Sequence, residues 1–104
     1  MNSISRFTTP THTFALPFET SGITALTVVY KQGDRVVLVK HKDDVTLSDK
    51  NVVVNLSEKD TALFDPTPKV KIQLRIGMGS ARINSDIVEV SVSDVLKEGM
   101  LDDL

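Results

Sequence analysis

The sequence predicts an all-β sandwich, and three observations support this prediction. First, β-branched residues are abundant: the 104 residues include 14 Val, 6 Ile and 10 Thr against only 4 Ala, a composition that favours strands. Second, several segments alternate apolar with polar residues, the period of a strand with one buried face. Third, turn residues separate these segments at intervals of roughly 8–12 residues, which is typical of a sandwich or a small barrel.

The clearest strand covers residues 70–76, where four aliphatic residues alternate with polar ones. A tight connection at residues 77–80 follows, and the chain returns over residues 82–92, so the two segments predict an antiparallel hairpin. Residues 84–86 are expected to form a bulge or a break in the returning strand.

A second hairpin is predicted upstream. Residues 26–31 alternate, meet a glycine turn at residues 32–34, and return over residues 35–42. The remaining predicted strands are residues 13–16, 45–47 and 52–56.

Residues 57–64 break the alternating pattern and predict one helical turn that crosses between the sheets. Ser57 is a good N-cap, and Asp60 three residues later approximates a capping box. Leu63 and Phe64 are expected to close the end of the core. Together the elements predict an immunoglobulin-like antiparallel β-sandwich of about seven strands with one short helical crossover, although the cysteine pair and core tryptophan of antibody domains are absent.

The length suits a single domain. We expect the sandwich to cover residues 12–96, flanked by a flexible N-terminal arm at residues 1–11 and an acidic C-terminal tail at residues 97–104. The arm contains Ile4 and Phe7. Apolar residues in such terminal segments either dock on a neighbouring subunit or stay disordered, and both alternatives remain open.

Composition excludes several classes of function. The chain has no cysteine, which rules out disulfides, thiolate metal sites and cysteine nucleophiles. Its net charge is -2, whereas binders of nucleic acid or anionic membranes usually carry a basic excess. No apolar run is long enough for a secretory signal or a membrane span. We therefore expect the protein in the cytoplasm where it is made.

Motifs with catalytic chemistry are scarce. His12 and His41 are the only histidines; neither has a carboxylate at metal-ligand spacing, and both are interpreted as surface residues at strand ends. The Gly-rich segment 77–79 is followed by a strand, whereas a phosphate loop requires a helix there. Asp43 and Asp44 do not form a calcium-loop pattern. We expect no enzymatic activity, no cofactor and no metal.

The best candidates for partner docking lie on the polar face of the clearest strand. Lys69, Lys71 and Arg75 share that face, with Gln73 between the last two. Such a stripe suits an acidic partner surface, but it is also the usual charged covering of a strand that must not aggregate. The two apolar residues of the arm complete the set of candidate docking residues.

A resemblance to a known group adds context. Residues 9–11 and 14–21 resemble the start of small immunoglobulin-like structural proteins encoded in prophages of low-GC Gram-positive bacteria, and a similar domain opens some baseplate proteins. Lys40 stands where that group usually has an acidic residue. The likeness continues, in register with the predicted strands, over residues 28–33, 36–40, 56–64, 70–75 and 85–96.

The resemblance implies a non-enzymatic virion or virion-assembly component of a phage, in the tail, baseplate or head–tail connector. Its partners would be other phage structural proteins, or a second copy of the chain, and it would reside in the bacterial cytoplasm during assembly and then in the virion. The alternative is a small ligand- or carbohydrate-binding β-sandwich module. The scarcity of aromatic residues argues against the carbohydrate case, because sugars stack on Trp or Tyr.

Overall fold

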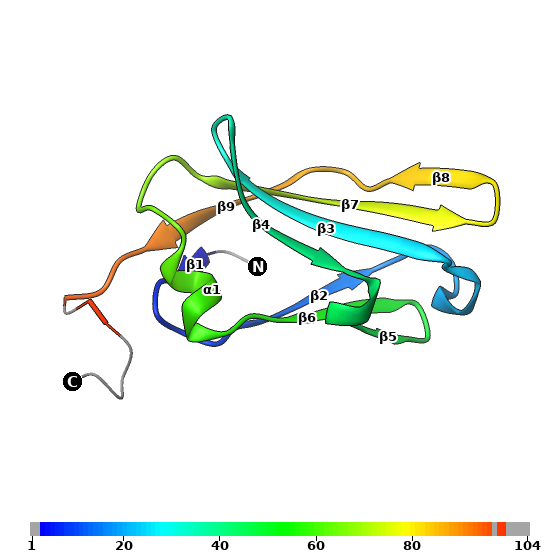
Figure 1. The fold of residues 1–104 in the computed structure, drawn as a ribbon, viewed down its shortest axis with the longest axis horizontal. Helices are drawn as coiled ribbons and strands as arrows, with labels where there is room; N and C mark the ends of the chain where they lie inside the picture. Colours follow the sequence, from blue (N-terminus) through cyan, green and yellow to red (C-terminus); the bar gives the residue numbers. More distant parts are fainter. Residues whose placement is uncertain (1–2, 97, 100–104) are drawn as a thin grey trace.

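Two β-sheets pack face to face in the computed structural model, which describes residues 3–96 and 98–99 (Figure 1). The predicted all-β sandwich is confirmed. The larger sheet contains, in spatial order, β1 (Ser3–Ser5), β9 (Val88–Ser93), β7 (Val70–Met78), β3 (Ala25–Gln32) and β4 (Arg35–His41), with β8 (Ala81–Asn84) also paired to β7. The smaller sheet contains β2 (Thr11–Ala15), β6 (Asn51–Asn55) and β5 (Thr46–Ser48).

The chain passes between the sheets in the way of immunoglobulin-like domains. It enters the smaller sheet with β2, makes the β3–β4 hairpin in the larger sheet, returns for β5 and β6, and finishes with β7, β8 and β9. Gly33 and Gly79 sit in the two hairpin turns with φ of 59° and 60°, a left-handed conformation that glycine adopts without strain. Short 3₁₀ turns occupy Thr20–Gly22 and Lys42–Asp44.

The described residues form nine strands where about seven were predicted. One reason is that predicted strand 82–92 is divided into β8 and β9, which pair with different parts of β7. Ser85 holds the chain at the division. Its backbone N–H donates to the Leu74 carbonyl, and the Leu74 N–H donates to its hydroxyl, both at 2.9 Å. The expected break near residues 84–86 is therefore present.

The other additional strand lies within the predicted N-terminal arm. β1 pairs in parallel with β9, so the larger sheet is mixed rather than purely antiparallel. Ile4 is fully buried in the core. Residues 3–5 of the predicted flexible arm are therefore a strand of the larger sheet, and the side chain of Ile4, a predicted docking residue, is not exposed to a partner. The sequence did not predict β1, because a strand of three residues shows no recognisable period and its partner β9 is far away in sequence. The predicted tail, residues 97–104, lies outside the described residues except for 98 and 99.

The crossover helix α1 (Glu58–Ala62) joins β6 to the larger sheet. Its capping box is confirmed: the Asp60 N–H donates to the Ser57 hydroxyl at 3.1 Å, and the Ser57 N–H donates to the Asp60 carboxylate at 2.9 Å. Phe64 closes the core as predicted and is fully buried. Leu63 does not, because successive residues at a helix end point in different directions; its side chain is 51% exposed.

Candidate docking surface

The outer face of the larger sheet carries the predicted docking stripe. Within β7, Lys71 and Arg75 are exposed, and the aliphatic residues between them are buried against the smaller sheet. Lys69 immediately precedes the strand and is also exposed. The period of two thus placed these side chains correctly, because each strand of a sandwich has one face toward the core.

Neighbouring strands add charges that the linear sequence does not connect with the stripe. Lys31 of β3 lies opposite Lys71, and Glu89 of β9 lies opposite it on the other side. Arg82 of β8 lies opposite Gly77, one row beyond Arg75. We call the set Lys31, Lys69, Lys71, Arg75 and Arg82 the basic face.

The cations of the basic face have no ion-pair partner among the described residues. Ion pairs of the described residues join Arg6 to Asp94 and Glu98, Arg35 to Asp65, and Lys40 to Asp60, so none involves the basic face. Like charges directly opposite one another on a sheet are destabilising, as at Lys31 and Lys71. Unpaired cations gathered in a chain of net charge -2 therefore attract an acidic surface to this face.

Gln73 has a structural role on this face. It is half-buried, and its side-chain amide donates to the Ser85 carbonyl at 3.0 Å. This bond ties the middle of β7 to the segment where β8 ends. Gln73 therefore supports the surface between Lys71 and Arg75.

Phe7, the other apolar candidate of the arm, is half-buried and adopts a left-handed backbone with φ of 58°. Its ring lies 5.2 Å from the guanidinium carbon of Arg6, within cation–π range. It therefore lies beside Arg6 at the end of the sandwich that carries α1, away from the β7–β8 turn.

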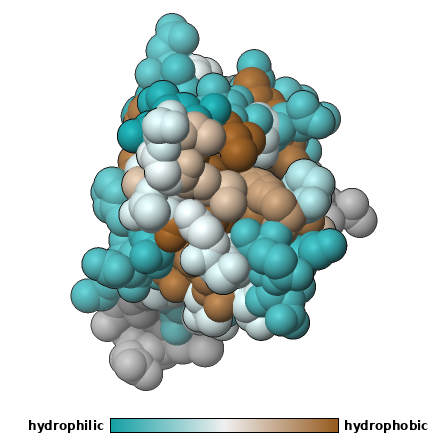
Figure 2. Space-filling model, turned by 90° about the vertical axis from the view of Figure 1, so that its right-hand side faces the viewer, coloured by the Kyte–Doolittle hydropathy of each residue, from teal (hydrophilic) through white to brown (hydrophobic). Residues whose placement is uncertain are grey.

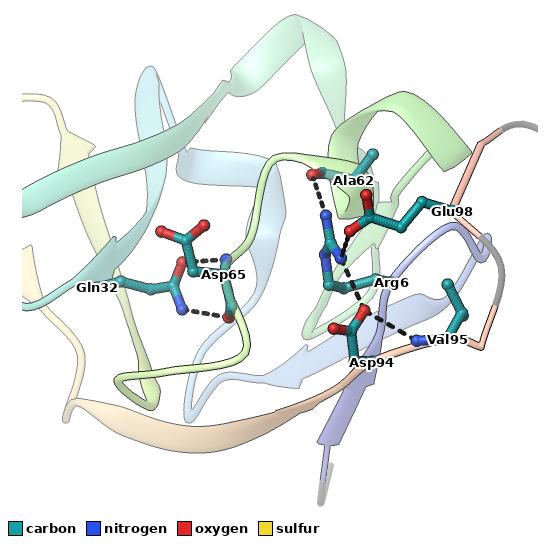
Figure 3. A network of polar contacts seen from close by, with 7 residues as sticks. All are labelled: Arg6, Gln32, Ala62, Asp65, Asp94, Val95 and Glu98. Atoms are coloured by element: carbon teal, nitrogen blue, oxygen red, sulfur yellow. Dashed lines mark hydrogen bonds and ion pairs between the residues drawn. The ribbon is translucent and has the colours of Figure 1, made fainter.

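Arg6 joins the N-terminal segment to the segment that follows β9, and no sequence motif marks it. Its Nη1 donates to Asp94 and to Glu98, both at 2.7 Å, and its Nη2 donates to the Ala62 carbonyl at 3.4 Å (Figure 3). The hydrogen bonds that Arg6 donates to Glu98 and Asp94 raise the pKa of Arg6. The same hydrogen bond to Asp94 lowers the pKa of that carboxyl group. This cluster has a structural explanation, because the Arg6 guanidinium joins two carboxylates after β9 to the end of α1.

Gln32 is a second polar residue that the sequence pattern did not reveal. It is buried at the end of β3, and its amide donates to the carbonyls of Asp65 and Pro68, both at 2.8 Å. Its carbonyl accepts from the Asp65 N–H at 2.9 Å (Figure 3). One side chain thus satisfies the backbone of the loop between α1 and β7, which explains a glutamine in the core.

The two histidines differ. His41 is exposed at the end of β4, as expected, but His12 is only 3% exposed and the prediction of a surface residue is wrong for it. Nδ1 of His12 and the hydroxyl of Tyr30 share a hydrogen bond of 2.8 Å. Burial lowers the pKa of His12 and raises that of Tyr30. Nε2 of His12 has no partner among the described residues, and the charge of Asp60 also contributes to the raised pKa of Tyr30.

An apolar cavity of about 600 Å³ lies between the edges of the two sheets, where β2 and the chain that follows it face β8 and the start of β9. Phe14, Leu16 and Phe18 line one side, and Ile76, Ile83 and Val88 line the other. Figure 2 views the end of the sandwich that carries the β7–β8 turn and shows apolar side chains gathered there within a polar surround. No linear pattern predicts this cavity, because its two walls come from different sheets.

No group of three His, Cys, Asp or Glu side chains within residues 3–96 and 98–99 is placed to hold a metal ion. Over the same part of the chain, no helix has the length and apolarity needed to cross a membrane.

Comparison with known proteins finds no family model that matches the chain and no matching curated protein.

Proposed function

We propose that the protein is a non-enzymatic virion or virion-assembly component of a phage or prophage, acting in the tail, baseplate or head–tail connector through protein–protein contacts. The observation that carries the proposal is the basic face, whose cations come from three strands and have no ion-pair partner among the described residues. A rigid sheet presents these charges in fixed positions, which favours recognition of an acidic partner surface. The resemblance to prophage-encoded structural proteins supports the phage setting.

The experiment follows the protein through phage assembly. A lysogen that encodes the chain is induced, and virions and assembly intermediates are separated on gradients and probed with an antibody. We expect the protein in one or both fractions. Its absence from both would contradict the virion role.

Charge reversal tests whether the basic face makes the contact. The double variant Lys71→Glu, Arg75→Glu should be lost from these fractions, because it repels an acidic partner. The matched control Lys42→Glu, Lys50→Glu changes two exposed lysines elsewhere and should assemble normally. If both variants assembled alike, the virion role would stand and the docking face would be wrong.

A small-ligand-binding module is the second candidate, and the cavity between β2 and β8 favours it. Its volume of about 600 Å³ is in the range of small-molecule sites, and its lining is mainly apolar. An apolar ligand suits this lining better than a carbohydrate does. A thermal-shift screen against apolar ligands should give saturable stabilisation that Ile83→Asp, on the cavity wall, abolishes; no hit would dismiss this candidate.

A further inference from the structure

A small recess on the outer face of the larger sheet has two arginines beside it. Its volume is about 220 Å³, and Arg75 and Arg82 line it together with Thr27 and Asn84. Gly77 provides its floor: a Cβ there would lie 3.4 Å from Nη1 of Arg82. The absence of a side chain at residue 77 therefore lets the Arg82 guanidinium lie close over the backbone of β7.

Both guanidiniums are held in place by neutral groups. Nη1 of Arg82 donates to the carbonyls of Gly79 and Ala81, both at 2.8 Å, and Nε of Arg75 donates to the Asn84 side chain at 3.4 Å. No carboxylate of the described residues pairs with either arginine. Each guanidinium thus retains N–H donors for an external acceptor. Because Arg82 is already ordered in the free protein, binding costs little additional side-chain entropy there.

We infer that this recess receives a carboxylate side chain from an acidic segment of a partner protein. Guanidinium donors match the two oxygens of a carboxylate, and a recess between two of them concentrates positive charge. The inference rests on the proposed docking role of the basic face, and it names the point where that contact is most specific.

Strand spacing favours an extended segment over a free anion. Alternate residues of a strand are roughly 6.6 Å apart, so Lys71 and Arg75, which are four residues apart in β7, lie roughly 13 Å from each other along the strand. An extended partner with acidic residues four positions apart can therefore place one carboxylate in the recess and another near Lys71. A free anion would use the recess alone.

The test titrates ¹⁵N-labelled protein with a capped hexaglutamate peptide and follows the backbone amides and the Nε–Hε signals of the arginines by NMR. The binding constant should be measurable at low salt and fall as salt rises. We expect Arg75 and Arg82 to shift most. Hexaglutamine, which has the same length without the charge, should cause no shifts.

Three variants distinguish binding in the recess from general electrostatic attraction to the basic face. Gly77→Val fills the recess without changing any charge, and Arg82→Gln removes one guanidinium; each should weaken binding by about tenfold or more. Lys71→Gln removes a charge from the same face outside the recess and should weaken binding by less than about twofold. Thermal unfolding checks that Gly77→Val is folded, and the exposed Arg82→Gln gives an independent answer if it is not.

Each other outcome overturns the inference in a recognisable way. If Lys71→Gln and Arg82→Gln weaken binding equally and Gly77→Val has no effect, the recess is not the site, although the docking face stands. If inorganic phosphate shifts the two arginines and the peptide does not, the recess binds a free anion. If hexaglutamate binds nowhere on the protein, the recess and the acidic-partner docking proposal both fail.

Discussion

Replacement of Ile4 by alanine tests whether the N-terminal segment is part of the folded domain. Ile4 belongs to β1, which pairs with β9 at the edge of the larger sheet, and its side chain is fully buried in the core. The substitution removes three carbon atoms, which at about 0.8 kcal/mol each gives about 2.4 kcal/mol of lost transfer free energy. The cavity that remains adds to this, so we expect the free energy of unfolding to fall by about 2–5 kcal/mol.

Urea denaturation followed by circular dichroism measures the change, and thermal unfolding gives a second reading. A loss of 2.4 kcal/mol should lower the melting temperature by about 10 °C or more in a domain of this size. The control is Ile87→Ala, which removes the same atoms from a side chain that is 57% exposed and should change stability by less than about 0.5 kcal/mol. Equal stability of the two variants would mean that residues 3–5 do not contribute to the free energy of unfolding and are not part of the folded core.

Three further predictions concern the core, the helix and the buried histidine. Ile72→Ala should cost about 2–5 kcal/mol in urea denaturation and Lys71→Ala less than about 0.5 kcal/mol, and the opposite order would show that the faces of β7 are assigned backwards. Ser57→Ala removes the N-cap acceptor of α1 and should cost about 1 kcal/mol by the same assay, whereas no loss would contradict the capping box. Because burial lowers the pKa of His12 below its ordinary 6.5, the unfolded chain binds a proton that the folded chain does not. The free energy of unfolding should therefore fall as pH drops below about 6.5 and level off above it; His12→Gln should reduce this slope, and an unchanged slope would refute the assignment.

The sequence predicted those parts of the fold that depend on local signals. Alternation in residues 70–76 identified both the strand and its polar face, because a strand in a sandwich is buried on one side only. The Ser57 capping box was readable because all of its atoms come from four consecutive residues.

Residues whose role depends on a distant partner were missed. The role of Arg6 could not be predicted, because its acceptors, Asp94 and Glu98, lie about ninety residues away in sequence. His12 gave no sign of burial, since its partner Tyr30 belongs to the other sheet. Nothing in a linear pattern reports which side chains two packed sheets bring together.

The sequence by itself therefore determined the β class, the two hairpins, the helical crossover and the polar face of β7. Each of these follows from short-range periodicity or turn chemistry, which neighbouring residues specify. Only the tertiary structure decided that β1 belongs to the core, that Lys31 stands opposite Lys71, and that Arg82 lies over Gly77. The physical reason is cross-strand register: it is set by packing of the whole sandwich, and it alone determines which charges become neighbours.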